Sequence, residues 1–184
     1  MRIIAGEWRG RKLVAPQGEA TRPTADRARE TLFSMLASRL GGFTGLAVAD
    51  LYAGSGALGF EALSRGAASC VFVDLDREAI ASIRANAATL GATAADIRQQ
   101  SVTGLARAAA PLDLLFLDPP YATADLGAVL TRLMAQGWIG PASMVSVETA
   151  AGESIDGWPL DHLVSRKVGK AELHLFHGTK SDEE

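Results

Sequence analysis

Cysteine is nearly absent from this sequence, because Cys70 is the single one among 184 residues. No disulfide can therefore form within the chain, and a reducing compartment, the cytoplasm, is expected. The sequence also lacks an apolar run long enough for a signal peptide or a membrane span. Its three histidines have no cysteine or paired acids at ligand spacing, so no metal site is predicted.

No charge of one sign dominates the chain, whose net charge is −3. Residues 1–40 hold eight Lys or Arg and four Asp or Glu, a balance of +4, and the remaining 10 Lys or Arg and 17 Asp or Glu give −7. A basic end on an acidic body is typical of a polyanion-binding surface and equally of an ordinary solvated face. Charge alone leaves both interpretations open.

Strand-like and helix-like patterns alternate along most of the chain. Short apolar patterns predict strands at 46–52, 70–74, 96–100, 112–117 and 143–148, and a last hairpin of 162–168 with 171–176. Helical spacing predicts helices at 25–40, with Thr24 as N-cap, then at 77–90 and 126–134. The alternation predicts an α/β fold, with a mainly parallel sheet, helices on both faces and antiparallel pairing at one edge.

The stretch DLYAGSGALG, residues 50–59, follows the first of these strands. Its glycines Gly54, Gly56 and Gly59 form G-x-G-x-x-G, which serves a nicotinamide dinucleotide or S-adenosylmethionine (SAM) alike. Gly54 and Gly56 allow a tight turn close to a ligand, whereas Gly59 serves either the ligand or close helix packing. Asp74, at the end of the next strand, is placed to accept hydrogen bonds from a ribose.

Asp50 distinguishes the two cofactors. A pyrophosphate prefers neutral amides at a helix N-terminus, and a carboxylate before the first glycine repels it. SAM instead carries a sulfonium and an ammonium group, which a carboxylate attracts. Asp50 therefore favours SAM, unless it only caps the end of its strand.

The stretch Asp118-Pro119-Pro120-Tyr121 ends the fourth predicted strand and thus reaches the same edge of the sheet. Two prolines stiffen the turn, which presents the Asp118 carboxylate and a nearby carbonyl, that of Pro119. Hydrogen bonds to these acceptors would localise the lone pair of an exocyclic amine and direct it at a methyl group. Asp118 can also take the proton, and Tyr121 offers a face for an extruded base. A plain Pro-Pro turn is the structural alternative.

Three stretches together resemble the bacterial RsmD family. They are RIIAGEWRGRKL at 2–13, RPTADRARETLF at 22–33 and DLYAGSGALGFEALSR at 50–65, and the similarity spans nearly the whole chain, weakest after residue 150. The resemblance implies a seven-stranded mixed SAM-dependent methyltransferase sheet, with a β-hairpin extension at 1–20 and the methyltransferase domain at 21–184. It also implies methylation of the 2-amino group of one guanine in 16S ribosomal RNA (rRNA), in an assembled or nearly assembled small subunit. We expect a monomer.

The resemblance assigns roles to further residues. The cofactor would be bound by Asp50, Tyr52, Ala53, Gly54, Gly56, Gly59, Asp74, Leu75, Ser101 and Val102. Ser101 stands where such enzymes usually have Asp or Asn, so its hydroxyl or a backbone amide would replace that adenine contact. The target guanine would lie against Asp118, Pro119, Pro120 and Tyr121, and the rRNA against Arg9, Arg11, Lys12, Arg22 and Thr24. Trp8 either stacks on RNA or packs the hairpin onto the domain.

Other functions remain open at this stage. The Asp-Pro-Pro-Tyr turn also suits an adenine- or cytosine-specific methyltransferase acting on other RNA or DNA. A protein glutamine methyltransferase resembles N-P-P-Y, and this chain has Asp118. A nicotinamide-dependent oxidoreductase is disfavoured by Asp50 and the Pro-Pro turn. A non-catalytic ribosome-assembly factor is disfavoured by the intact turn.

Overall fold

The predicted alternation of strands and helices is present in the computed structural model, which describes residues 1–16, 23–120 and 125–178, and only the backbone of 23–25. The elements are α1 (Pro23–Leu40), β1 (Ala47–Leu51), α2 (Ala57–Ser64), β2 (Ser69–Asp74), α3 (Arg77–Leu90), β3 (Ala95–Gln99), the 3-10 turn η1 (Val102–Gly104), β4 (Leu114–Leu117), α4 (Leu126–Ala135), β5 (Met144–Ala150), β6 (Asp161–Val168) and β7 (Ala171–His177). Within the described residues, no helix is both long and apolar enough to cross a membrane.

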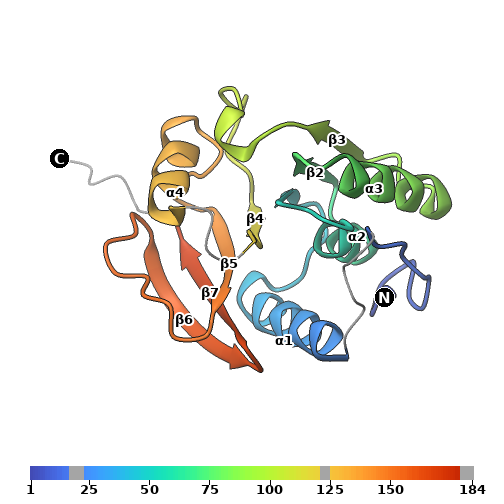
Figure 1. The fold of residues 1–184 in the computed structure, drawn as a ribbon, viewed down its shortest axis with the longest axis horizontal. Helices are drawn as coiled ribbons and strands as arrows, with labels where there is room; N and C mark the ends of the chain where they lie inside the picture. The colour runs from blue at the N-terminus through green and yellow to red at the C-terminus, as the bar shows by residue number, and fades with distance from the viewer. Residues whose placement is uncertain (17–22, 121–124, 179–184) are drawn as a thin grey trace.

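The seven strands form one mixed sheet in the order β3-β2-β1-β4-β5-β7-β6 (Figure 1). The first five in this order are parallel, and β7 lies antiparallel between β5 and β6. This arrangement confirms the predicted fold class. The strand order reverses between β1 and β4, and in open α/β sheets ligands bind at that point, beyond the carboxyl ends of the strands.

Each face of the sheet packs on its own hydrophobic cluster. On one face, apolar residues of α1, α2 and α3 pack against alternate strand residues such as Val48, Phe72 and Phe116. On the other face, α4 and the η1 region pack against the intervening residues, such as Ala49 and Leu117. Figure 1 shows α4 apart from the other three helices. Burial on both faces explains why the central strands are almost entirely apolar.

The start of α1 differs from the prediction. The helix begins at Pro23, so Thr24 lies in its first turn and the prediction of Thr24 as N-cap is wrong. Proline is favoured at the first helical position because its φ angle already suits a helix and its missing N–H has no partner there.

Residues 1–14 form a hairpin-like loop that docks on α2 and α3. An antiparallel bridge joins Arg2 to Lys12, and the Ile3 N–H donates to the Arg11 carbonyl at 2.9 Å. The fully buried Glu61 carboxylate of α2 accepts hydrogen bonds from the Ile4 and Ala5 N–H groups, at 2.8 and 3.0 Å. The segment thus shares the core of the main fold, while the predicted domain boundary at 20/21 lies outside the described residues.

Candidate active site

The glycine loop between β1 and α2 has the backbone that its sequence predicts. Gly54 and Gly56 have φ angles of 54° and 77°, in the left-handed region that favours glycine. Tyr52 also has a positive φ, 62°, which is uncommon for a residue with a side chain. Asp74 holds the loop, because its carboxylate accepts the Gly54 N–H at 2.8 Å and the Asp76 N–H at 2.9 Å.

Asp50 lies at the end of β1 and is 2% exposed. Its carboxylate accepts the Gly59 N–H at 2.8 Å and so ties the end of the strand to the first turn of α2. Burial raises the pKa of the neighbouring Cys70 thiol, and the charge of Asp50 raises it further. Cys70 is therefore a buried, un-ionised residue of β2.

Gly59 has a packing role. A Cβ atom at this position would overlap the ring of Phe72 and lie 2.7 Å from Sγ of Cys70, so only glycine lets α2 lie this close to β2. Gly56 and Gly59 line neither of the cavities described next, so their part in cofactor binding stays a prediction.

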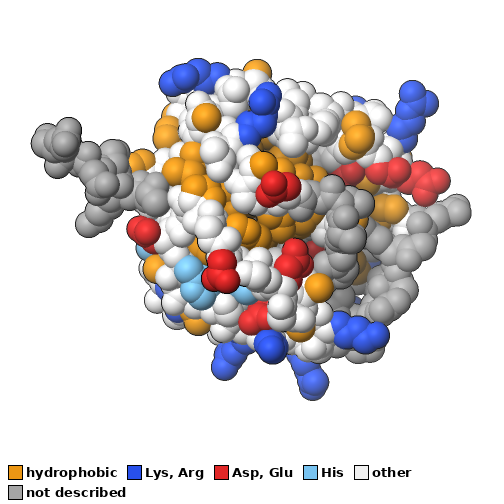
Figure 2. Space-filling model, turned by 60° about the vertical axis from the view of Figure 1, so that its left-hand side comes forward, with side chains coloured by type: hydrophobic (Ala, Val, Ile, Leu, Met, Phe, Trp, Pro, Cys, Tyr) orange, Lys and Arg blue, Asp and Glu red, His pale blue; other side chains and the backbone are white. Residues whose placement is uncertain are grey.

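Two cavities open at the carboxyl ends of the parallel strands, and Tyr52, Gly54 and Asp118 line both. The outer cavity, about 700 Å³, contains most of the predicted cofactor residues, and its wall includes Tyr52, Gly54, Asp74, Leu75, Gln100, Ser101, Val102, Asp118, Pro119 and Pro120. The inner cavity, about 350 Å³, is lined mainly by Met1, Arg29, Leu32, Asp50, Tyr52, Ala53, Gly54, Ser55, Leu58, Asp118, Glu148 and Leu173. Figure 2 shows an apolar hollow with acidic side chains around it, and Lys and Arg farther out.

The outer cavity combines apolar and hydroxyl groups. Leu75 directly follows Asp74 and is 69% exposed, so its apolar side chain forms part of the open wall of the cavity. Ser101 precedes η1, where its Oγ accepts the Thr103 N–H at 3.2 Å and contacts Thr103 Oγ1 at 2.8 Å. Burial raises the pKa of the half-buried Tyr52 phenol, which stays neutral at the junction of the two cavities.

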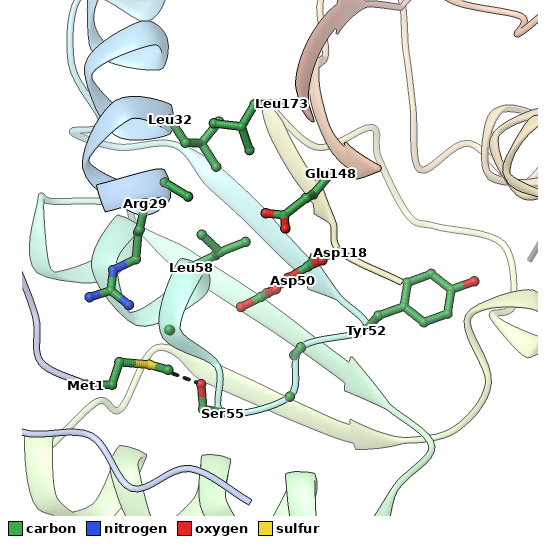
Figure 3. A pocket seen from close by; sticks show the side chains of 14 residues that line it. Met1, Arg29, Leu32, Asp50, Tyr52, Ser55, Leu58, Asp118, Glu148 and Leu173 are labelled. Carbon is green, nitrogen blue, oxygen red and sulfur yellow. Dashed lines mark hydrogen bonds between the residues drawn. The ribbon is translucent and has the colours of Figure 1, made fainter. Parts of the chain in front are cut away.

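The inner cavity brings together charged groups from distant parts of the chain. Figure 3 shows the side chains of Asp50, Asp118 and Glu148 on one side and the Arg29 guanidinium on the other. Arg29 is 5% exposed, and its Nη2 donates to the Arg2 carbonyl at 2.6 Å and to Asp26 at 3.0 Å. Its buried Nε is the one buried side-chain nitrogen or oxygen without a hydrogen-bond partner among the described residues.

Sequence reasoning missed Arg29 and Glu148 as site residues, although each carried a signal. Arg29 lies three residues before Leu32, so it falls on the apolar side of α1 that packs on the core. A charged residue on such a buried side is uncommon unless it has a partner, and this is a signal of a functional role. The predicted strand 143–148 ends at Glu148, as Asp50, Asp74 and Asp118 lie at or just after the ends of theirs, although β5 itself continues to Ala150.

Three of the residues predicted to bind rRNA, Arg9, Arg11 and Lys12, lie near one another on the hairpin-like loop, and none of them is in the described lining of either cavity. The hairpin tip, which carries Arg9, Arg11 and Lys12, lies at the C-terminal ends of α2 and α3. There the Glu7 N–H donates to the Ser64 carbonyl, and the Arg11 guanidinium donates to the Thr89 carbonyl. The same part of α3 also contacts the glycine loop, since the Asn86 side chain donates to the Ser55 carbonyl at 3.0 Å. Trp8 is half-buried and packs against the core cluster, which supports its packing role.

The structure does not describe the side chains of three predicted site residues. Arg22 and Tyr121 lie outside the described residues, and so does the side chain of Thr24. No group of three or more His, Cys, Asp or Glu suited to a metal ion occurs in the described part of the chain.

The sheet, the glycine loop and the Asp-Pro-Pro turn define a SAM-dependent methyltransferase. A family model described as "Conserved hypothetical protein 95" matches residues 1–177, and the chain belongs to this family, the RsmD family that its sequence resembles.

Named relatives and solved structures agree with this assignment. Ribosomal RNA small subunit methyltransferase D of Escherichia coli (strain K12) is 36% identical over 179 residues, which cover 96% of this chain and 89% of the relative. The putative rRNA methyltransferase YlbH of Bacillus subtilis is 43% identical over 138 residues, 72% of this chain and 73% of the relative. The structure of the putative methyltransferase yhhF from Escherichia coli has a TM-score of 0.84 at 33% identity and covers 98% of this chain and 99% of its own.

Proposed function

We propose that this enzyme transfers a methyl group from SAM to the exocyclic 2-amino group of a guanine in 16S rRNA. The small ribosomal subunit would be the substrate, and a monomer in the cytoplasm would act on it. The observation that carries the proposal is the position of Asp118, which lines both cavities and would therefore lie beside a cofactor bound across them. The names of the relatives, rRNA small subunit methyltransferases, support the rRNA substrate.

The two cavities together fit SAM. Asp74 would bind the ribose, and Leu75, Ser101 and Val102 would border the adenine in the outer cavity. In the inner cavity, Asp50 would attract the ammonium and sulfonium groups, and Arg29, with its unpartnered Nε, would attract the carboxylate. When bound, SAM supplies an electrophilic methyl group.

The Asp118-Pro119 turn would act on the nucleophile. The Asp118 carboxylate and the Pro119 carbonyl accept hydrogen bonds from the guanine 2-amino group, whose lone pair is then less delocalised into the ring. The same contacts fix the direction of attack, and the Asp118 carboxylate takes the proton that the amine loses. Tyr121 would stack on the extruded base, and Arg9, Arg11 and Lys12 would contact rRNA away from the target.

The test is methyl transfer from labelled SAM to small subunits that lack the modification, followed by nucleoside analysis. We expect label in 2-methylguanosine, and a loss of about 100-fold or more in turnover for Asp118→Ala, because a proton acceptor and an oriented hydrogen bond are both removed. Binding of S-adenosylhomocysteine by this variant should persist. Label in methyladenosine or methylcytidine would support the alternative base, and no label in any RNA would contradict the proposal.

A further inference from the structure

The Asp118 turn alone does not select a base, because adenine, cytosine and guanine all carry an exocyclic amine. A second carboxylate lies next to it in the sheet. β4 and β5 are parallel, and the last pair in register is Leu117 opposite Val147. Asp118, which directly follows β4, and Glu148 in β5 therefore each come one residue after that pair. Both side chains line the inner cavity, and Figure 3 shows them close together there.

The two carboxylates, Asp118 and Glu148, match the hydrogen-bond donors of guanine. Guanine presents two neighbouring donors, the 2-amino group and N1–H, whereas adenine and cytosine present an acceptor ring nitrogen beside their amine. Ionised carboxylates only accept hydrogen bonds, and each offers about four lone-pair positions. Two adjacent carboxylates therefore suit guanine, and the second one repels the ring nitrogen of adenine or cytosine.

We propose that Glu148 selects guanine by accepting the N1–H hydrogen bond while Asp118 holds the 2-amino group. This inference rests on the proposed function. Glu148 is half-buried and comes from a rigid central strand, which suits a group that must discriminate by position. Leu173, its partner on β7, supplies an apolar wall beside it.

The test compares two target bases in reconstituted subunits, guanine and 2-aminopurine, which keeps the 2-amino group but has an acceptor at N1. For the unmodified enzyme we expect kcat/KM to be about 10- to 100-fold lower with 2-aminopurine, the usual worth of a hydrogen bond to a charged group. Glu148→Gln should lower activity on guanine and reduce this preference to threefold or less, because its amide can donate to N1.

The matched control is Glu153→Gln, which changes an exposed acid just after β5 and should keep the preference. Binding of S-adenosylhomocysteine should be unchanged in both variants. An equal loss on both bases, or an unchanged preference in Glu148→Gln, would overturn the role of Glu148 while the function stands. Methylation of adenine or cytosine by the unmodified enzyme would overturn both.

A different observation concerns the groove between α1 and β6, about 660 Å³ in volume. Its polar lining comes from Glu30, Thr31, Ser34, Ser38, Arg39, Ser165 and Arg166. Arg166 pairs with Leu173, which lines the inner cavity and pairs with Glu148, so the groove lies one strand from that cavity on the same face. Arg27 lies one turn before Thr31 on α1, and the Thr31 hydroxyl donates to the Arg27 carbonyl at 2.9 Å. Arg27 therefore lies beyond the groove, toward the end of α1 where Arg29 lines the inner cavity.

We infer that the α1–β6 groove binds the rRNA backbone next to the target guanine, again resting on the proposed function. Arg27, Arg39 and Arg166 are exposed, and Glu30 is the one carboxylate in the described lining, so the groove attracts phosphate. The hydroxyls of Thr31, Ser34 and Ser38 add neutral donors of the kind that contact phosphate.

Binding of small subunits at several salt concentrations, with S-adenosylhomocysteine present, tests the groove. Arg39→Gln with Arg166→Gln should weaken binding about tenfold and lower the slope against log salt by about 1 to 2. Glu30→Gln should strengthen binding about twofold, and Arg132→Gln, on the exposed side of α4, should change nothing. Equal binding by all variants, or weaker binding by Glu30→Gln, would overturn the groove, whereas a failure of the unmodified enzyme to bind subunits would overturn the proposed function as well.

Discussion

The two cavities of the site differ in where their walls come from. The outer cavity is built largely from segments that directly follow β1, β2, β3 and β4, and Pro16 and the start of α3 complete its described wall. The inner cavity adds α1, β5, β7 and residue 1, which are up to 172 positions apart in the chain. Local motifs therefore describe the outer cavity well, whereas the inner one depends on how the whole sheet and α1 are assembled.

Arg29→Met should give the largest difference between a ligand that would fill both cavities and one that would fill only the outer cavity. Because Arg29 would bind the carboxylate of the cofactor, S-adenosylhomocysteine should bind about 1.5 to 3 kcal/mol more weakly. Methylthioadenosine, which lacks the amino-acid group, should bind with unchanged affinity. Titration calorimetry with both ligands measures the difference, and Arg29→Lys should recover part of it.

An equal loss for both ligands would mean that Arg29 acts on the fold and not on the carboxylate. The melting temperature separates these cases, because Arg29 also donates to the Arg2 carbonyl and holds the N-terminal segment. If Arg29→Met keeps its melting temperature and loses affinity only for S-adenosylhomocysteine, Arg29 binds the carboxylate of the cofactor.

Asp74→Ala should weaken the binding of both ligands equally, and by less than Arg29→Met weakens that of S-adenosylhomocysteine. Both ligands carry the ribose, and both depend on the loop that Asp74 holds through the Gly54 N–H. We expect both affinities to fall together by about 1 to 2 kcal/mol, measured in the same calorimetric titrations. A loss confined to S-adenosylhomocysteine would contradict the assignment of Asp74 to the ribose side.

Much of the fold could be predicted because local signals and tertiary packing agree. The bounds of α3, 77–90, were predicted correctly, since Asp76 caps its start through two N–H groups and Gly91 ends it with a positive φ. At α1 two local signals competed, and Pro23 rather than Thr24 marks the start. The pattern of the central strands was clear because they are buried on both faces.

The missing site residues had no local motif. Glu148 becomes a neighbour of Asp118 only through the pairing of β4 with β5, which a sequence pattern does not specify. The position of the basic hairpin tip depends on its docking to Glu61 and Ser64, and Arg9, Arg11 and Lys12 are not in the described lining of either cavity. Residue type and spacing predicted the chemistry, and strand order decided which groups share a cavity.

Docking of residues 1–14 through Glu61 has a consequence for the order of folding. Ala5, Trp8 and Val14 find their partners 56 to 72 positions later in the chain, at Glu61, Ser64 and Asn86. Until α3 has been synthesised, Ile3 and Leu13 have no core to enter. Contacts of such sequence separation form slowly, so the wall that Met1 contributes to the inner cavity is completed late, and the nascent chain cannot hold cofactor before its sheet is nearly whole.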